Sequence, residues 1–414
     1  MEVLKIATAG SVDDGKSTLI GRLLYDTKSL TDDKIEAIKK SSKKKGFDYL
    51  DFSLATDGLV AEREQGITID VAHIYFSTEK KSYIIADTPG HVEYTRNMVT
   101  GASNAQASII LIDARNGVIE QTKRHFFINN LLRVKHIIVA VNKMDLVDYN
   151  EDVFNAIKSD FEALNGKSTF NKQQITFIPI SALEGENVVT HSEKTNWYSG
   201  PTVLSYLEGL KAEETYQKSN FRFPVQTVIR PKQDAYHDYR GYAGKVYGDS
   251  VKVGDKVTVL PSLKESKVKE IQFFDGTFSE VNEGASVTIQ LEDDINVSRG
   301  DTIVKTNEVP NSSKELEATI CWMDTKKLAQ GTKYLIQHNT NIVLSKVDKV
   351  AHTVATDYSG IEEVNELGLN DIGKVSFKLS KSLFYDSYHE NKSNGSFILI
   401  DAQTNTTAGV GFID

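Results

Sequence analysis

The sequence predicts a doubly wound α/β domain with a mostly parallel sheet, followed by two antiparallel β-barrel domains. Apolar runs alternate with helical patterns over residues 1–210, which is typical of parallel strands that helices cover on both faces. After residue 220 these helical patterns stop, and short β-rich runs separated by turn signals take over. With 414 residues the chain is also too long for one compact core, so we expect several domains.

The predicted sheet is assembled from short apolar runs, each followed by a loop or a helical pattern. The predicted strands are 4–9, 68–76 (an edge strand), 82–86, 107–114, 136–141 and 175–180. The predicted helices lie near 16–25, 92–103, 120–133, 151–165 and 202–212.

The barrels are predicted to follow a polar, charged linker at 212–220, and the segment 310–313 is the predicted joint between them. Strands of the first barrel are expected at 223–229, 241–247, 256–260, 266–274 and 285–291. Strands of the second are expected at 317–323, 332–338, 340–350, 371–379 and 397–401. The predicted domains are therefore 1–213, 214–309 and 310–414.

Composition narrows the class of protein. The net charge of -9 argues against a nucleic-acid partner. We find no apolar run near the ~18–20 residues of a membrane span, and residues 1–6 enter a strand pattern without a signal peptide. The single cysteine, Cys321, fits a core residue in a reducing compartment. We therefore expect a cytoplasmic protein without membrane contact. The basic run 39–45 is expected to be a solvated loop or helix end, with a phosphate or partner contact as the alternative.

A phosphate-binding loop is predicted between the first strand and the first helix. Its residues match G-x-x-x-x-G-K-[ST] and are Gly10, Ser11, Val12, Asp13, Asp14, Gly15, Lys16 and Ser17, followed by Thr18. Backbone N–H groups of such a loop and the N-terminus of the next helix face a phosphate. Lys16 would contact the β- and γ-phosphates, and the Ser17 hydroxyl would bind Mg²⁺. Alone, this motif predicts only a nucleoside triphosphate.

Two further motifs are typical of a site that senses the γ-phosphate. One follows the predicted strand 82–86 and consists of Asp87, Thr88, Pro89 and Gly90. Asp87 would hold Mg²⁺ through water, and the Gly90 N–H would sense the γ-phosphate. The other is the segment 64–68, in which Thr68 could close over Mg²⁺ and γ-phosphate and release them after hydrolysis. Each is common by itself, but their order and their distance from the phosphate loop favour the functional interpretation.

Guanine selectivity is predicted by the loops after strands 136–141 and 175–180. The first loop consists of Asn142, Lys143, Met144 and Asp145, and the second of Ser181, Ala182 and Leu183. Asp145 can accept hydrogen bonds from guanine N1–H and N2–H₂, whereas adenine would leave this carboxylate unpaired. The Lys143 stem can lie along the ring, Asn142 can brace the loop, and the Ala182 N–H can meet guanine O6. The first half is thus predicted to be a P-loop GTPase domain.

His91 follows the aspartate motif directly and is the predicted catalytic residue, together with Lys16 and Thr68. Many small GTPases have a glutamine here that orients the attacking water, and a histidine can do the same by hydrogen bonding. A structural or solvent-facing histidine is the plain alternative. The other histidines are scattered without metal-binding spacing.

These motifs and the two barrels resemble the translational GTPase family of elongation factor Tu. Closer similarity within that superfamily is to the GTPase subunit of bacterial ATP sulfurylase (sulfate adenylyltransferase subunit 1). The similar segments are 10–26, 57–72, 94–103, 197–202, 222–226, 240–244 and 295–301. In elongation factor Tu the residue after Asp13 is typically histidine, whereas this chain has Asp14.

The resemblance implies a heterodimer whose separate small subunit joins ATP and sulfate into adenylylsulfate and pyrophosphate, while this chain couples GTP hydrolysis to that reaction. It implies GTP and Mg²⁺ as cofactors, and Asp13 is placed to position a monovalent cation. A second P-loop motif does not occur, so adenylylsulfate kinase activity is not expected. The alternatives are an elongation factor Tu-like GTPase that binds aminoacyl-tRNA and a stand-alone signalling GTPase. Acidic barrel segments such as 292–294 argue against the first, and the two barrels argue against the second.

Overall fold

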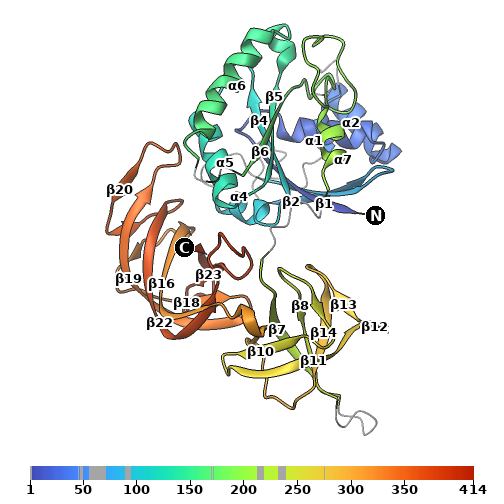
Figure 1. Ribbon diagram of the computed structural model, residues 1–414. Coiled ribbons are helices and arrows are strands. Elements are labelled where there is room, and N and C mark those ends of the chain that lie inside the picture. The colour runs from blue at the N-terminus through green and yellow to red at the C-terminus, as the bar shows by residue number, and fades with distance from the viewer. Residues whose placement is uncertain are drawn as a thin grey trace. The chain divides into compact units, whose positions relative to one another are not determined.

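The computed structural model describes residues 2–44, 46, 50–55, 71–88, 95–168, 170, 172–211, 219–231, 239–274 and 276–414. The chain forms two compact units (Figure 1). The first comprises Met1–Thr215 with Ala355–Gly360, and the second comprises Tyr216–Val354 with Ile361–Asp414. Among the described residues, every helix is too short or too polar to cross a lipid bilayer.

The first unit is built on a sheet whose described strands follow the order β2-β3-β1-β4-β5-β6. The strands are β1 (Val3–Ala9), β2 (Ala72–Ser77), β3 (Ser82–Asp87), β4 (Ala107–Asp113), β5 (His136–Asn142) and β6 (Gln174–Pro179). Neighbours are parallel, except that β2 pairs antiparallel with β3 at the edge. Every residue of β4 and β5 is buried, as expected for central strands covered on both faces.

Helices cover the two faces of this sheet (Figure 1). One face carries α1 (Lys16–Asp26), α2 (Asp32–Lys44) and α7 (Val203–Gly209), and the other carries α4 (Thr95–Ala102), α5 (Glu120–Leu131) and α6 (Glu151–Asn165). Two 3-10 turns, η1 (Phe52–Ala55) and η3 (Met144–Val147), connect elements of this unit. Leu19 of α1, Ile38 of α2 and Leu207 of α7 join the strand residues in one core.

Helix α2 is an element that the sequence analysis missed. Its apolar side is narrow, because Ile38 and Ser42 are its buried residues, and charged residues surround them. The lysines of the basic run that the structure describes stand exposed in the second half of this helix; they are Lys39, Lys40, Lys43 and Lys44. The described lysines therefore lie on a solvated helix end, as the plainer expectation held, and a phosphate or partner contact stays a prediction.

The second unit contains two antiparallel barrels. In the first, the described strands follow the order β10-β15-β7-β8-β14-β11-β12, and pairing of β10 with β11 closes the ring. Its strands are β7 (Arg222–Ile229), β8 (Gly241–Lys245), β9 (Val251–Lys252), β10 (Lys256–Leu260), β11 (Lys264–Phe273), β12 (Gly276–Phe278), β13 (Glu280–Val281), β14 (Ser286–Leu291) and β15 (Thr302–Lys305), with the turn η6 (Thr306–Glu308) after them.

The second barrel repeats this plan with the order β18-β23-β24-β16-β22-β19-β20, and β18 pairs with β19. Its strands are β16 (Asn311–Trp322), β17 (Leu328–Ala329), β18 (Lys333–His338), β19 (Asn341–Val354), β20 (Ile361–Glu363), β21 (Glu366–Leu367), β22 (Ile372–Tyr385), β23 (Ser396–Ile400) and β24 (Thr407–Ile413). Each barrel has its own apolar core, and Cys321 is buried in β16. The predicted fold class is confirmed.

One boundary element differs from the prediction. The expected joint at 310–313 is not a separate loop, because residues 311–313 already pair with residues 383–385 of β22. These first residues of β16 are polar and largely exposed, so they lack the apolar alternation that marks a strand in a sequence. The predicted domain limits themselves stay a prediction, and the first of them, at 213, lies outside the described residues.

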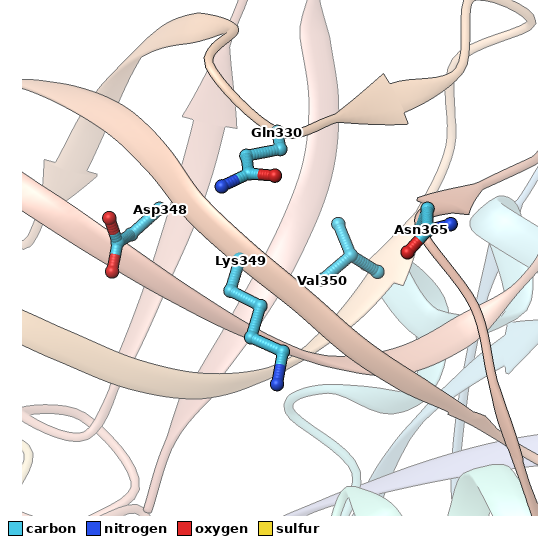
Figure 2. Close-up of a pocket in the computed structure, with 5 residues that line it drawn as sticks. All are labelled: Gln330, Asp348, Lys349, Val350 and Asn365. Carbon is cyan, nitrogen blue, oxygen red and sulfur yellow. The ribbon is translucent and has the colours of Figure 1, made fainter.

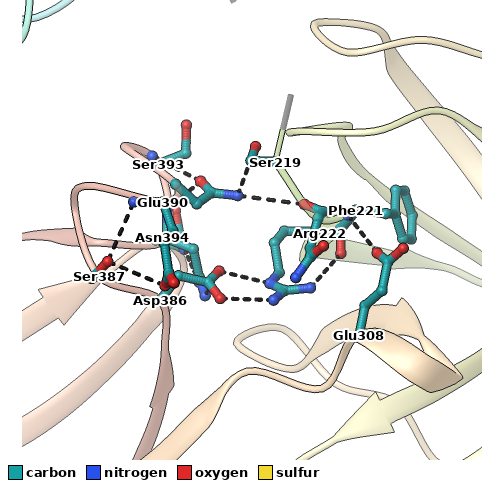
Figure 3. Close-up of polar contacts among 12 residues, drawn as sticks. Ser219, Phe221, Arg222, Glu308, Asp386, Ser387, Glu390, Ser393 and Asn394 are labelled. Atoms are coloured by element: carbon teal, nitrogen blue, oxygen red, sulfur yellow. Dashed lines mark hydrogen bonds and ion pairs between the residues drawn. The ribbon is translucent and has the colours of Figure 1, made fainter. Parts of the chain in front are cut away.

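A buried polar network joins the two barrels within the second unit (Figure 3). Arg222, at the start of β7, is 1% exposed, and its Nε and Nη2 donate to the two carboxylate oxygens of Asp386 at 2.8 and 2.7 Å. The Asn394 amide donates to Asp386 at 2.8 Å, and Arg222 Nη1 donates to the Phe221 carbonyl at 2.9 Å. Such a paired, bidentate contact satisfies charges that would be costly to bury alone.

Candidate nucleotide-binding site

The loop 10–17 connects β1 to α1 at the carboxyl edge of the sheet. Asp13 and Gly15 adopt left-handed backbone conformations, with φ of 69° and 93°. A Cβ at Gly15 would stand 2.5 Å from Asn142 Nδ2, so both the backbone and the space there require glycine. Gly15 also caps α1 without a side chain, which leaves the first N–H groups of this helix facing the loop.

Lys16 lies folded over this loop. Its ammonium donates to the Gly10 carbonyl at 2.9 Å and to the Ser11 carbonyl at 3.4 Å, and the residue is 7% exposed. Burial lowers the pKa of this ammonium, while Asp87, Asp14 and Asp13 oppose the shift by stabilising the charged form. The lysine is therefore buried and held over the loop by two carbonyl oxygens, and the charges of three carboxylates favour its charged form.

Asp87 ends β3 beside the loop, because its neighbour in the sheet register is Thr8 of β1. The Thr8 hydroxyl donates to Asp87 Oδ1 at 2.9 Å, and the Thr88 hydroxyl donates back to the Thr8 carbonyl at 2.5 Å. Asp87 is 3% exposed, so its carboxylate is fixed rather than solvated. Ser17 lies in the first turn of α1, directly after Lys16, and carries a hydroxyl. A hydroxyl and a carboxylate fit Mg²⁺, which takes oxygen ligands and usually keeps water and phosphate as the rest.

Several predicted residues cannot be placed. Glu64 to Thr68, Pro89, Gly90 and His91 lie outside the described residues. The third predicted Mg²⁺ ligand, Thr68, and the predicted catalytic histidine are among them, and their roles stay predictions.

Asn142, at the end of β5, ties three loops together. Its Nδ2 donates to the Asp14 carbonyl at 2.7 Å, and its Oδ1 accepts from the Ala182 N–H at 2.9 Å. The phosphate loop, the 142–145 loop and the 181–183 loop are thereby held at one edge of the sheet. Met144 is buried and its N–H donates to the Ile180 carbonyl at 3.2 Å, which fixes the backbone just before the half-buried Asp145.

The last of these loops is braced from α1. Ser181 and Ala182 are buried, and Leu183 is half-buried. The Leu183 carbonyl accepts from Arg22 Nη1 at 3.3 Å, so the helix that follows the phosphate loop also positions the 181–183 loop.

Asp113 belongs to this edge and was missed by the sequence analysis. It ends β4, is 2% exposed, and stands opposite Asn142 in the β4–β5 register. Its carboxylate receives Lys143 Nζ at 3.0 Å and Arg115 Nη2 at 2.6 Å. Although burial alone would raise it, the hydrogen bonds from Arg115 and Lys143 hold the pKa of Asp113 at about 2. The available signal was an aspartate that ends an apolar run at the carboxyl edge of a parallel sheet.

Asp14 is the other buried acid of the site. Its Oδ2 accepts from the Ser11 N–H at 2.5 Å, which closes the phosphate loop from inside. Burial raises the pKa of Asp14 to about 6, even though the Ser11 N–H and Lys16 favour the carboxylate.

A separate pocket of about 320 Å³ opens in the second barrel (Figure 2). It is lined by Gln330, Asp348, Lys349, Val350 and Asn365. The Asp348 carboxylate already pairs with Lys378 Nζ at 2.9 Å. Its lining residues lie outside every motif of the predicted nucleotide site.

These features define the class of a P-loop GTP-binding protein. They are a loop that requires glycine at a helix N-terminus, a buried lysine across that loop, a carboxylate at a strand end, and a base-recognition loop. The family model of the elongation factor Tu GTP binding domain matches residues 1–219, and the GTP-eEF1A C-terminal domain-like model matches residues 315–414.

Individual relatives are similar to this chain over its whole length. Sulfate adenylyltransferase subunit 1 of Aliarcobacter butzleri is 50% identical, with 100% of this chain and 87% of the relative covered. The protein of the same name from Bacteroides fragilis is 47% identical, with 100% and 86% covered. The bifunctional enzyme CysN/CysC of Mycobacterium tuberculosis is 46% identical, with 99% and 67% covered. The chain belongs to the sulfate adenylyltransferase subunit 1 family of elongation factor Tu-like GTPases.

Proposed function

We propose that this chain is the GTPase subunit of an ATP sulfurylase and couples GTP hydrolysis to the formation of adenylylsulfate and pyrophosphate from ATP and sulfate. The observation that carries the proposal is the junction at Asn142, which holds the phosphate loop and both base-recognition loops at one sheet edge. The names of relatives 46–50% identical over the full chain support sulfate activation as the reaction that is coupled.

Residues 10–18 would hold the phosphates of GTP. Lys16 would leave the Gly10 and Ser11 carbonyls for the β- and γ-phosphates, because phosphate oxygens offer its ammonium a stronger, charged acceptor. The oxygens of Ser17, Asp87 and Thr68 would hold Mg²⁺, which when bound neutralises charge on the phosphates. Asp13 would help to place a monovalent cation beside the same phosphates. Equal hydrolysis rates in sodium and potassium buffers would remove that cation from the proposal.

Hydrolysis would depend on His91 as the residue that orients the attacking water. Thr88, Pro89 and Gly90 would place it, with the Gly90 N–H reporting the γ-phosphate. Thr68 would close over the metal and γ-phosphate before hydrolysis and release them afterwards. The base would be read by Asp145, with Lys143 along the ring, Met144 as the buried anchor of the loop, and Ala182 between Ser181 and Leu183 donating to guanine O6.

The adenylyl transfer would take place in a separate small catalytic subunit that forms a heterodimer with this chain, and we assign no ATP- or sulfate-binding residues here. The name subunit 1 of the relatives supports such a partner. We further propose a cytoplasmic location, no nucleic-acid partner, and the division of the chain into a GTP-binding domain at 1–213 and barrels at 214–309 and 310–414.

The alternative is an elongation factor Tu-like GTPase that binds aminoacyl-tRNA, since the same family model covers the first domain of such factors. One binding experiment tests the GTP site that both proposals share, and a second separates the proposals. The purified chain should bind GTP far more tightly than ATP and lose much of that affinity when Mg²⁺ is chelated. Co-expressed with the small sulfate-adenylylating subunit from the same genome, it should co-purify at equal stoichiometry and leave aminoacyl-tRNA unbound. Binding of aminoacyl-tRNA without complex formation would favour the translation factor.

A further inference from the structure

Asp113 makes contacts that the roles proposed above do not use. It is almost fully buried, yet it is a carboxylate, and a buried carboxylate is destabilising unless cations or N–H groups satisfy it. Its Oδ1 accepts from the Arg115 N–H and from Arg115 Nε, both at 3.0 Å. Its Oδ2 accepts from Arg115 Nη2 at 2.6 Å and pairs with Lys143 Nζ at 3.0 Å. Both oxygens therefore bind the Arg115 guanidinium, while Oδ1 also holds the turn and Oδ2 also binds the Lys143 ammonium.

The cation that matters is Lys143. Its backbone is left-handed, with φ of 63°, and it follows Asn142, which stands beside Asp113 in the sheet register. The ammonium is tied to the end of β4 while the backbone belongs to the end of β5. The aliphatic stem must therefore run across the gap between these two strand ends. Asp145, the predicted guanine reader, lies two residues further along the same loop.

A lysine stem on a solvent-exposed loop loses rotamer freedom when it has to lie flat against a ligand, and this loss weakens binding. An ion pair that fixes the far end of the stem before the ligand arrives removes part of that loss. The Lys143 side chain is 22% exposed, so part of it is accessible to a base even with its ammonium paired. Arg115 is more open, with 48% of its side chain exposed, and covers the outer side of Asp113.

We propose that Asp113 is a positioning residue for guanine nucleotides. It anchors the Lys143 ammonium, so that the aliphatic stem of Lys143 is already placed to pack against the purine ring. The inference rests on the proposed role of residues 142–145 in base recognition. It adds a residue of β4, outside the five sequence motifs, to the determinants of nucleotide affinity.

The plain alternative is that Asp113 only closes the turn 113–117, whose backbone bonds run from the Asn116 and Gly117 N–H groups to its carbonyl. The variant Asp113→Asn separates the two roles. An asparagine Oδ1 can still accept from the Arg115 N–H and hold the turn, but its neutral amide would present N–H groups to Lys143 in place of a carboxylate oxygen.

The test is a double-mutant cycle on the full chain with GDP and Mg²⁺, measured by titration calorimetry. Asp113→Asn and Lys143→Ala should each weaken GDP binding by roughly tenfold, and the double variant should be no weaker than Lys143→Ala alone within about twofold, because both act on one contact. Arg115→Ala is the matched control, since it removes the other cation from Asp113, and it should change affinity by less than about threefold. The thermal unfolding midpoint of Asp113→Asn should stay within a few degrees of the parent.

Wild-type GDP affinity in Asp113→Asn would overturn the inference, as would losses that multiply in the double variant. Asp145→Asn distinguishes this failure from failure of the proposed function. If Asp145→Asn loses GDP while Asp113→Asn does not, the base-recognition loop stands and only the anchoring role falls. If neither variant affects GDP binding, the assignment of residues 142–145 falls as well.

Discussion

Removing one partner of the Arg222–Asp386 pair should destabilise the second unit strongly. Asp386→Ala deletes both oxygens that Arg222 uses and leaves a guanidinium with 1% of its residue surface exposed. The Phe221 carbonyl, 2.9 Å from Nη1, would still accept one hydrogen bond from the guanidinium. Breaking a buried pair in this way typically costs about 3–5 kcal/mol. For a unit of this size, at about 2–4 °C per kcal/mol, the unfolding midpoint should fall by roughly 6–20 °C.

The assay can isolate the second unit, because the sequence has two tryptophans and Trp322 is the one in a barrel core. In a Trp197→Phe background, urea unfolding followed by Trp322 fluorescence reports the barrels. Lys378→Ala is a matched control, since it breaks the Lys378–Asp348 pair of the same barrel, whose side chains are 60% and 45% exposed. This exposed pair should contribute little to stability. Replacing both buried partners, as Arg222→Met with Asp386→Leu, should recover most of the loss. If Asp386→Ala destabilises the barrels no more than Lys378→Ala does, the Arg222–Asp386 pair does not hold the two barrels together.

Other predictions concern the first unit. Asp145→Asn should weaken GTP binding and favour xanthosine triphosphate, because the amide presents N–H groups to guanine donors; unchanged GTP affinity in a competition titration would contradict the guanine assignment. Lys16→Ala should abolish measurable GTP binding, and a normal dissociation constant would remove Lys16 from the site. His91→Ala should leave the GTP dissociation constant intact but slow single-turnover hydrolysis by at least about 100-fold, whereas unaltered turnover would make the histidine structural. Burial lowers the pKa of His125 to about 3, so below pH 6.5 the unfolded chain binds a proton that the folded chain does not, and stability falls as the pH drops toward 3. Between pH 6 and 4, the free energy of unfolding of His125→Gln should fall less steeply with decreasing pH than that of the parent, by up to about 1.4 kcal/mol per pH unit in denaturant titrations. The same pH dependence in both proteins would contradict a neutral buried histidine.

The sequence predicted the elements whose signal is local. Continuous apolar runs marked the central strands β4 and β5, and fixed spacing marked the phosphate loop before α1. The strand ends carried Asp87 and Asn142, and parallel strands bring such ends together at one edge. The order of the motifs was therefore enough to predict that these residues lie at one edge of the sheet.

What the sequence could not reveal depends on register and on long-range pairing. Asp113 meets Lys143 because β4 and β5 are neighbours in register, and no spacing rule links them. Arg222 and Asp386 are 164 residues apart and meet because two barrels fold against each other within one unit.

Strands without apolar alternation were also missed or shortened. Strand β24 contains Gly411, whose absent side chain makes room for the ring of Phe397, so packing rather than pattern defines it. The ends of β19 and β22 were left out because the alternation breaks there: residues 351–354 are all half-buried, and the polar residues 380–382 interrupt β22 before Leu383.

Coupling of GTP hydrolysis to sulfate activation by this chain can be measured in a reconstituted system. The most direct measurement is a reconstitution of the chain with the small sulfate-adenylylating subunit, in which GDP and adenylylsulfate are quantified together, with and without ATP and sulfate. We expect strong stimulation of GTP hydrolysis only when the partner, ATP and sulfate are all present, with adenylylsulfate accumulating in step with GDP beyond its equilibrium level without GTP. A hydrolysis rate that does not change with the partner and its substrates, with adenylylsulfate no higher than without GTP, would rule out coupling.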